Sequence, residues 1–356
     1  MRKSSVSLLK CINCENEKLD AVSFNSEKGQ IVQGKIVCSK CSSTWPIING
    51  VPRIFKKNLL EKLTIEKFPL FFKKYSKEFN FSVDENKLDE NAKVKTAKSF
   101  GYEWNKYSKI LDIFEKDWKR YFNPIITKDN IKNKVVVDVG CGLAKHGYFT
   151  AKYGAKYIGV DLSDAVEDAY KNTKEFNSLI VQADIFDMPI NGKKVDLFYS
   201  IGVIHHLPDP KAGFLEIAKL MQKKGAKIFI WVYGKKGNKR ALYFYNPVRV
   251  ITTRIPKKIM DPLCHIPAIA VHSINLATLG IEKIGFKKLA QKMPFYYYTN
   301  FPYSFKHNDS FDVLATPTQE YYDKKDIEKW FLDAKIKDFK LMDDKYQGIK
   351  AFGVKN

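Results

Sequence analysis

The chain has 356 residues, 45% of them hydrophobic and 28% charged, which is enough apolar material for packed cores and excludes a wholly disordered protein. This length accommodates two or three domains. The formal net charge is +22, but only six of the 61 basic residues are arginine, the side chain that nucleic-acid readers favour, so a nucleic-acid partner is not indicated by charge alone.

The cysteines and the apolar segments indicate the cellular compartment in which the protein is expected. Six cysteines in a chain of this length exclude a disulfide framework. Residues 1–14 have a basic start but no apolar segment long enough for a secretory signal. The most apolar stretch, 259–281, is interrupted by one acidic residue, two prolines and two histidines, so we expect no membrane-spanning helix. A cytoplasmic protein is the expectation, with peripheral membrane contact left open.

The first predicted element is a metal site. Two Cys-x-x-Cys pairs, Cys11/Cys14 and Cys38/Cys41, are separated by 23 residues that include a predicted β-hairpin around 29–37. Each pair places two thiolates on one turn, and two such turns supply the closed tetrahedral site of structural zinc. Redox-active pairs rarely occur doubled, and four thiolates leave no open coordination position for water. We therefore predict a structural Zn²⁺ rather than a catalytic one.

A short aromatic and proline-containing segment follows the second pair, with the sequence Trp45-Pro46-Ile47-Ile48-Asn49-Gly50-Val51-Pro52. Together with the cysteine pairs, this segment resembles the small zinc-ribbon activator proteins that partner tRNA and translation-factor methyltransferases. The resemblance covers residues 8–56. We expect a zinc ribbon over residues 1–57 and a charged helical connector or cap over residues 58–130.

A glycine turn then follows a β-branched run, in the sequence Lys134-Val-Val-Val-Asp138-Val-Gly140-Cys141-Gly142-Leu-Ala144. The run predicts a buried parallel strand, and the glycines allow close approach of a ligand before a helix at 145–153. The third glycine of a dinucleotide fingerprint is absent, as is the Gly-Lys-Ser/Thr of a phosphate-binding loop. The Asp-x-Gly-x-Gly pattern instead resembles motif I of the class I S-adenosylmethionine-dependent methyltransferases.

Three further strands are predicted in the order that this family uses. The strand at 157–161 ends in Asp161, 19 residues after Gly142, near the offset at which a carboxylate accepts ribose hydroxyls. The resemblance implies that Asp184, after the strand at 180–185, or its neighbours read the adenine amino group. It also implies that the fourth strand, 195–203, faces the methyl group. The predicted cofactor-binding residues are Asp138, Gly140, Cys141, Gly142, Asp161, Leu162, Asp184, Ile185, Ser200, Gly202, Tyr102 and Trp104.

The fourth strand leads into Val203-Ile-His205-His206-Leu-Pro-Asp-Pro, and a similar sequence recurs in small-molecule methyltransferases. His205 and His206 are the catalytic candidates, because an imidazole has the pKa range of a general base for a hydroxyl acceptor. The alternative is that one of them only caps the strand-to-helix turn.

The remaining elements define the fold. We expect a helix from Pro210, a strand at 227–232, a helix at 323–334 and two strands at 339–342 and 349–354. A helix followed by a β-hairpin is the characteristic end of the class I methyltransferase fold. The predicted class is therefore α/β, Rossmann-like, with a seven-stranded sheet and a C-terminal β-hairpin. The core occupies residues 131–234 and 311–356.

The insert at 235–310 is longer than an α/β connection requires, and we expect it to form a helical substrate lid. No acidic residue occurs between Glu216 and Asp261, which favours an anionic acceptor; ordinary solvated lysines are the alternative interpretation.

The predicted function is O-methylation, with S-adenosylmethionine, of a small or medium-sized metabolite that is anionic, lipid-linked or sugar-linked. One alternative is a tRNA, rRNA or protein methyltransferase with a fused activator-like ribbon. The Asn/Asp-Pro-Pro-Tyr/Phe motif of many base and glutamine N-methyltransferases is missing, which argues against this alternative but does not exclude ribose or ring-carbon methylation of RNA. A catalytically idle scaffold is a further alternative.

Overall fold

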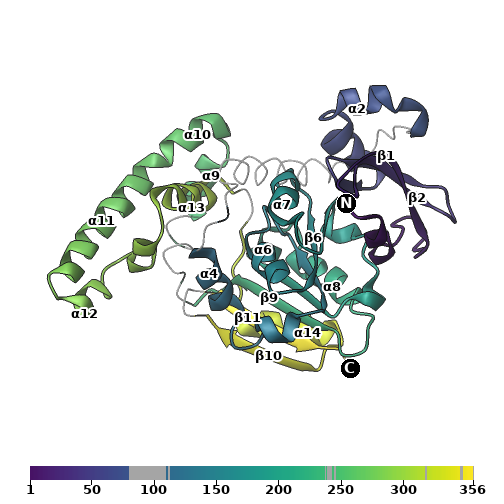
Figure 1. Ribbon diagram of the computed structural model, residues 1–356. Helices are drawn as coiled ribbons and strands as arrows, with labels where there is room; N and C mark the ends of the chain where they lie inside the picture. The colour runs from purple at the N-terminus through teal and green to yellow at the C-terminus, as the bar shows by residue number, and fades with distance from the viewer. Residues whose placement is uncertain are drawn as a thin grey trace. The chain divides into compact units, whose positions relative to one another are not determined.

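A computed structural model describes residues 1–79, 110, 113–236, 238, 243, 246–316, 319–344 and 348–355 (Figure 1). The chain divides into two compact units. We call Met1–Ile110, Phe114–Gly237 and Thr318–Asn356 the core unit, and Leu111–Ile113 with Asn238–Pro317 the helical unit. The predicted cofactor residues Tyr102 and Trp104 lie outside the described residues.

The core unit is built on one eleven-stranded sheet in the order β1-β2-β3-β4-β7-β6-β5-β8-β9-β11-β10. Five parallel strands form its centre: β5 (Val135–Val139), β6 (Lys156–Asp161), β7 (Ser178–Ala183), β8 (Leu197–Ile201) and β9 (Lys227–Tyr233). The hairpin of β10 (Asp338–Asp343) and β11 (Gly348–Val354) joins β9 in antiparallel pairing. These seven strands confirm the predicted class I methyltransferase sheet.

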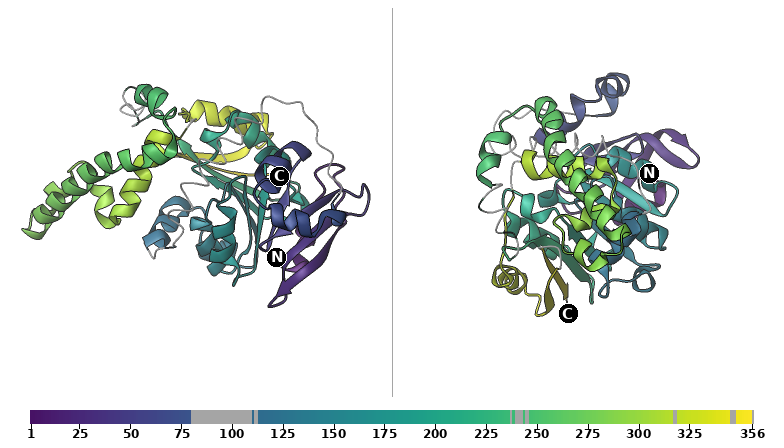
Figure 2. Two further views of the ribbon diagram at one scale, coloured as in Figure 1. Left: turned by 90° about the horizontal axis from the view of Figure 1, so that it is seen from above. Right: turned by 90° about the vertical axis from the view of Figure 1, so that its left-hand side faces the viewer.

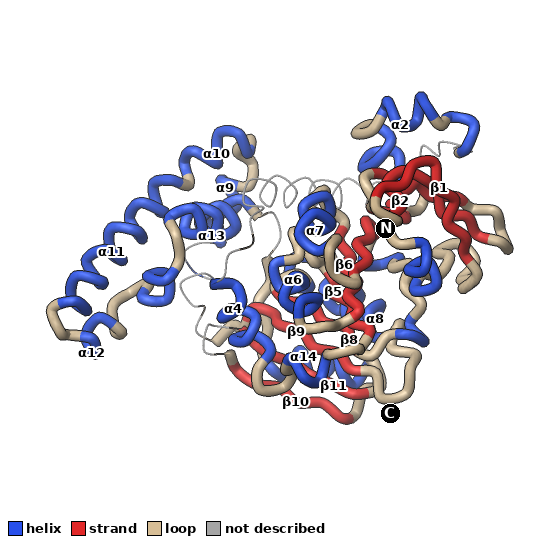
Figure 3. The backbone as a smooth tube through the Cα atoms, viewed as in Figure 1, coloured by secondary structure: helices blue, strands red, loops and turns tan. Residues whose placement is uncertain are grey.

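Helices cover both faces of this sheet (Figure 3). One layer contains α4 (Ile113–Phe122), α6 (Lys145–Lys152) and α7 (Val166–Thr173), and the indole Nε1 of Trp118 on α4 donates to Thr150 Oγ1 on α6 at 3.0 Å. The other layer contains α8 (Pro210–Lys219) and α14 (Lys324–Asp333), which meet through the rings of Phe214 and Phe331. Helix α8 begins where the sequence predicts, with Pro210 in its first turn and Asp209 accepting from Ala212 N–H.

The strand order reverses between β5 and β8, because β6 and β7 extend the sheet on one side of β5 while β8 and β9 extend it on the other. In open α/β sheets, ligands bind at the carboxyl ends of the strands beside such a reversal. The turn after β5 and the turn after β8 therefore delimit the expected site.

The N-terminal ribbon supplies the other four strands of the sheet: β1 (Leu19–Glu27), β2 (Gln30–Cys38), β3 (Thr44–Ile48) and β4 (Val51–Ile54). The hairpin of β1 and β2 turns at Lys28-Gly29, where both residues have positive φ. Strand β4 pairs in parallel with β7, which joins the ribbon to the methyltransferase sheet as Figure 2 shows. The eleven strands are thus the seven predicted ones plus the ribbon.

A buried arginine reinforces this junction. Arg53 on β4 is fully buried and donates to the side-chain oxygen of Gln182 on β7 and to the carboxylate of Glu167 on α7. Its guanidinium lies 4.4 Å from the centre of the Phe68 ring. Gln182 Nε2 in turn donates to the backbone oxygen of Leu162, at 3.1 Å, in the loop after β6. A continuous chain of polar contacts therefore connects the ribbon to the loop that follows Asp161.

Apolar packing reaches the same loop. The segment after the ribbon forms α1 (Lys57–Leu60), a π-helical turn (Glu61–Ile65) and α2 (Pro69–Lys74). Leu162 packs against a cluster from this segment, made of Phe55, Leu59, Leu60 and Leu63.

The helical unit consists of α9 (Asn246–Thr252), α10 (Lys257–Leu263), α11 (His265–Lys283), α12 (Lys287–Ala290) and α13 (Tyr303–Ala315). Its small core contains Met260, Cys264, Phe311 and Ala315. Within the described part of the chain, Lys257–Lys283 is the one helical stretch long and apolar enough to cross a membrane, and 22% of its most apolar window is buried. The prolines and histidines that argued against a span are accommodated within this helical stretch.

Candidate functional site

The glycine turn after β5 is held against the end of β6. Gly140 and Gly142 have φ of 79° and 52°, and a Cβ built on Gly140 would meet the Val203 side chain at 2.4 Å, so this turn requires glycine. The N–H of Gly142 donates to Asp161 Oδ2 at 2.8 Å. The structure thus brings together the two motifs that the sequence placed 19 residues apart.

Asp161 ends β6 with its carboxylate turned to this edge. Its Oδ1 accepts from the backbone N–H and the hydroxyl of Ser163, at 2.8 and 2.7 Å. Burial raises the pKa of Asp161, and the hydrogen bonds from Ser163 and Gly142 act against that shift. A ribose diol would share this carboxylate with Ser163.

Two other residues that were predicted to bind the cofactor form hydrogen bonds within the sheet. Asp138 is buried, and its Oδ2 accepts from the hydroxyls of Tyr157 and Tyr199, at 3.0 and 2.9 Å, which ties β5 to both neighbouring strands. Burial raises the pKa of Asp138 to about 7 despite these hydrogen bonds. Ser200 is also buried and donates to the Val139 carbonyl at 2.8 Å.

The ends of β7 and β8 carry further predicted residues. Asp184 caps the 3-10 turn Ile185–Asp187, accepting from Phe186 N–H at 3.1 Å, and it is buried with Ile185. Gly202 follows β8 with φ of 75°, and no heavy atom of the described residues lies within 4 Å of a Cβ built on it. The backbone at the end of β8 therefore leaves open space beside Gly202.

The histidine pair lies on the next turn, a 3-10 turn formed by Ile204–His206. Both imidazoles are buried, with ring centres 4.2 Å apart. His205 also lies 4.0 Å from the ring of Tyr233 at the end of β9. Its carbonyl accepts from Glu320 N–H at 3.0 Å, so the chain before α14 holds this turn in place.

Trp231 and Tyr233 contact His205, and two further aromatic rings extend from them; the sequence argument assigned none of the four to the site. Tyr233 contacts Trp231 and stacks on Tyr321, with centre distances of 5.3 and 5.6 Å, and Trp231 meets Tyr121 of α4 at 5.3 Å. Trp231 and Tyr233 are two residues apart on one strand and so share a face, which is a signal that the sequence does carry. The contribution of Tyr121 depends on tertiary packing and has no such signal. We call Tyr121, Trp231, Tyr233 and Tyr321 the aromatic wall.

His146 in the first turn of α6 extends the wall, with its ring 5.1 Å from Tyr121. Burial and the Lys145 ammonium lower the pKa of His146 to about 3, so its imidazole is neutral at neutral pH.

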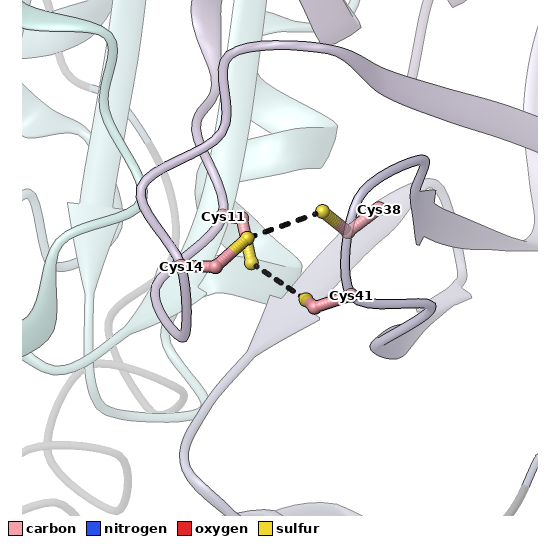
Figure 4. A group of neighbouring side chains, drawn as sticks. All are labelled: Cys11, Cys14, Cys38 and Cys41. Atoms are coloured by element: carbon pink, nitrogen blue, oxygen red, sulfur yellow. Dashed lines mark hydrogen bonds between the residues drawn. The ribbon is translucent and has the colours of Figure 1, made fainter.

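The four ribbon cysteines converge from two turns, as Figure 4 shows. All four sulfurs lie within 4.8 Å of one another, with 3.5 Å between Cys11 and Cys41 and 3.6 Å between Cys14 and Cys38. A tetrahedron with Zn–S bonds of about 2.3 Å has sulfurs about 3.8 Å apart, so the donor set fits zinc. Asn16 Nδ2 donates to Cys38 Sγ at 3.5 Å, which suits a thiolate.

Comparison with known proteins agrees with this geometry. Residues 137–229 match the family described as "Methyltransferase domain". The ubiquinone biosynthesis O-methyltransferase of Coxiella burnetii (strain RSA 331 / Henzerling II) is 29% identical over 153 residues, which are 42% of this chain and 64% of that protein. The tRNA U34 carboxymethyltransferase of Campylobacter jejuni (strain RM1221) is 27% identical over 260 residues, 65% of this chain and 81% of that protein.

Among solved structures, the magnesium protoporphyrin IX methyltransferase of Synechocystis with bound S-adenosylmethionine aligns with a TM-score of 0.42 and 13% identity, covering 78% of this chain and 100% of that one. The first curated relative is matched over less than two thirds of its length. The matched segment contains the glycine turn, Asp161, Asp184 and the histidine turn, within the sheet order described above. Residues 137–229 therefore belong to a methyltransferase domain, and the strand order of its sheet is that of the class I fold.

Proposed function

We propose that the whole protein is an S-adenosylmethionine-dependent O-methyltransferase whose acceptor is a flat aromatic or conjugated compound that carries a hydroxyl group. The aromatic wall beside the open end of β8 carries this proposal. Rings that line one side of a site favour flat acceptors through offset stacking and edge contacts. Transfer to oxygen is supported by the C. burnetii relative, which is named as an O-methyltransferase.

The cofactor is proposed to bind at the edge formed by the glycine turn and the ends of β6 and β7. The turn from Gly140 to Gly142 lets backbone approach the ligand closely, and Asp161 accepts the ribose hydroxyls. Leu162 and Ile185 supply apolar contact beside adenine, and Asp184 orders the turn that reads its amino group. When bound, S-adenosylmethionine supplies an electrophilic methyl group on a sulfonium.

The protein's part in the reaction is proposed to be positioning with proton removal. Methyl transfer is an in-line displacement, so the aromatic wall contributes by holding the acceptor oxygen in line and excluding water. His205 and His206 are the candidates for removing the hydroxyl proton, since both lie on the turn after β8. His205 is packed on Tyr233, and that contact fixes its ring orientation.

The two histidines can be distinguished experimentally. Replacing the one that acts as base with alanine should lower kcat by about 10²- to 10⁴-fold, with partial recovery at high pH as the acceptor ionises by itself. Replacing one that only orders the turn should lower the midpoint of thermal unfolding and leave the pH profile of kcat unchanged. If neither His205→Ala nor His206→Ala changes the pH profile, catalysis proceeds by positioning alone and the assignment of a base is wrong.

The ribbon is proposed to hold a structural Zn²⁺ through Cys11, Cys14, Cys38 and Cys41. The fit of the four sulfurs to a tetrahedron supports this proposal. The metal stabilises the ribbon turns, and through β4 the ribbon supports the strand next to the cofactor edge.

An RNA acceptor is the second candidate, because the relative with the longer alignment is a tRNA carboxymethyltransferase. The deciding experiment incubates the protein with tritiated S-adenosylmethionine and separate metabolite, lipid and RNA fractions of a cell extract. We expect label in a metabolite or lipid fraction, and much less of it with Asp161→Ala. Label that appears in RNA and is lost on ribonuclease treatment would refute the proposed acceptor class, while the absence of cofactor binding in a calorimeter would refute the activity itself.

A further inference from the structure

The long helix α11 of the helical unit has an inverted distribution of polarity. Its buried positions are Ala268, Asn275 and Thr278, two of which are polar. Its outward positions include Ile266, Ile269 and Leu276, whose exposed fractions are 69%, 55% and 57%. A surface helix in water normally buries its apolar stripe and exposes its polar one. The outward face of α11 is therefore suited to an apolar surrounding.

Polar contacts fix this orientation. Asn275 Nδ2 donates to the Phe295 carbonyl at 3.0 Å, and the His265 ring is hydrogen-bonded to the Tyr303 hydroxyl at 2.7 Å. The ring of His307 on α13 contacts the Asp261 carbonyl at 2.9 Å. Turning the apolar face inward would break these contacts and leave buried polar groups without partners, so the helix is held with its isoleucines outward.

The apolar face continues beyond α11 and is bordered by positive charge. Residues 262–281 contain no Asp, Glu, Lys or Arg, a length of about 30 Å in a helix. Further exposed apolar side chains lie on both sides of this segment, at Val250, Ile251, Ile259, Ile284, Phe286 and Leu289. Exposed cationic side chains lie at its two ends, at Arg254, Lys258, Lys283, Lys287, Lys288 and Lys292. From 246 to 292 there are eight basic residues and two acidic ones.

This combination matches the surface of a bilayer that contains anionic lipids. Apolar side chains enter the boundary between headgroups and acyl chains, while lysines at the border contact lipid phosphates, each contributing about 1 kcal/mol. A membrane-spanning arrangement fits less well. Helix α13, packed on α11, has only 13 residues and carries Lys306, Asp309 and Asp312. A span would place these charges in hydrocarbon.

We infer that the helical unit docks on anionic membranes, with α10, α11 and α12 lying in the plane of the interface and the apolar face inserted. The lysines at the two ends of that face contact the lipid headgroups. This docking is separate from methyl transfer and does not depend on the proposed acceptor.

The test is flotation of the full-length protein with vesicles of phosphatidylcholine alone or mixed with phosphatidylglycerol. We expect binding to the mixed vesicles that weakens with added salt. Ile266→Ser/Ile269→Ser should lower the partition coefficient by about tenfold or more, and Lys287→Glu/Lys288→Glu should lower it similarly. The matched control is Leu332→Ser on α14 of the core unit, an apolar side chain with 53% exposure, which should bind like wild type.

Circular dichroism checks that each variant is folded. Because the substituted side chains are exposed, we expect the substitutions to leave the fold intact. Equal binding by the wild type and the isoleucine variant would overturn the inference, as would no binding to either vesicle. Sedimentation velocity tests the remaining alternative, which is a dimer formed through the apolar face. A dimer that dissociates on Ile266→Ser/Ile269→Ser, without vesicle binding by the wild type, would show that the face joins two copies of the chain and would also overturn the inference. Resistance to extraction by alkaline carbonate would indicate a span instead of docking.

Discussion

Replacing Arg53 by methionine should destabilise the core unit and weaken cofactor binding at a distance. Methionine keeps much of the length and removes the charge, so Glu167 loses its cation and Gln182 loses a charge-assisted donor. Breaking a buried ion pair from one side costs about 3–5 kcal/mol. The Glu167 side chain is 18% exposed and regains some hydration, so we take the lower end, about 3 kcal/mol.

Two measurements test this expectation. The midpoint of thermal unfolding should fall by roughly 6–12 °C for a domain of this size. The affinity for S-adenosylmethionine, measured by calorimetry below that midpoint, should fall by about fivefold. Gln182 supports the Leu162 carbonyl in the loop after Asp161, and one hydrogen bond is worth about 1 kcal/mol.

Two further variants separate this mechanism from general damage. Lys171 on α7 has a side chain that is 67% exposed and pairs with Asp168 at 2.8 Å, so solvent screens its charge and Lys171→Met should change stability by less than about 1 kcal/mol. The double variant Arg53→Met/Glu167→Met removes both charges and should recover part of the stability lost in the single variant. The reasoning is wrong if Arg53→Met is no more destabilising than Lys171→Met, or if the double variant is less stable than the single one.

Three shorter predictions concern the cofactor edge, the zinc ribbon and the buried acid of β5. Asp161→Ala should weaken S-adenosylmethionine binding by at least about tenfold in calorimetry, while Asp161→Asn, which still accepts from Gly142, should retain more affinity. Unchanged affinity in Asp161→Ala would argue against ribose binding by the carboxylate. We expect mass spectrometry to find one equivalent of zinc in the wild type and none in Cys38→Ser/Cys41→Ser, which should also have a lower thermal midpoint. A metal-free wild type would contradict the ribbon assignment. The folded-state pKa of Asp138 is raised to about 7, so the wild type should lose stability relative to Asp138→Asn as the pH rises from 4 to 7. Urea unfolding should show a loss of up to roughly 4 kcal/mol. A difference in stability that does not depend on pH would refute the raised pKa.

Much of the core fold could be predicted because its signals are local. The β-branched run before Gly140, the acid at the end of β6 and the helix-hairpin ending each lie within a few consecutive residues, and the family resemblance supplied their order. The cysteine spacing alone predicted which four sulfurs would meet, and the structure brings them together.

The rest depended on contacts between distant parts of the chain. Arg53 and Gln182 are 129 residues apart, and nothing near either one indicates that a ribbon strand pairs with β7. Asp138 belongs to the glycine motif, but only the positions of Tyr157 and Tyr199 show that its carboxylate is held within the sheet. Composition showed that α11 is apolar, but the direction of its apolar face required the packing of α13.

The pairing of β4 with β7 also has a consequence for how the protein avoids self-association. In the sheet, β7 has neighbours on both sides, and the two outermost strands are β1 and β10. Without the ribbon, β7 would become an edge strand, and the backbone groups of Gln182 and Ala183 that now pair with β4 would lose their partners. Such an edge is a template for pairing with other chains. The ribbon therefore covers the carboxyl end of this edge and removes a place where another chain could pair with the methyltransferase sheet.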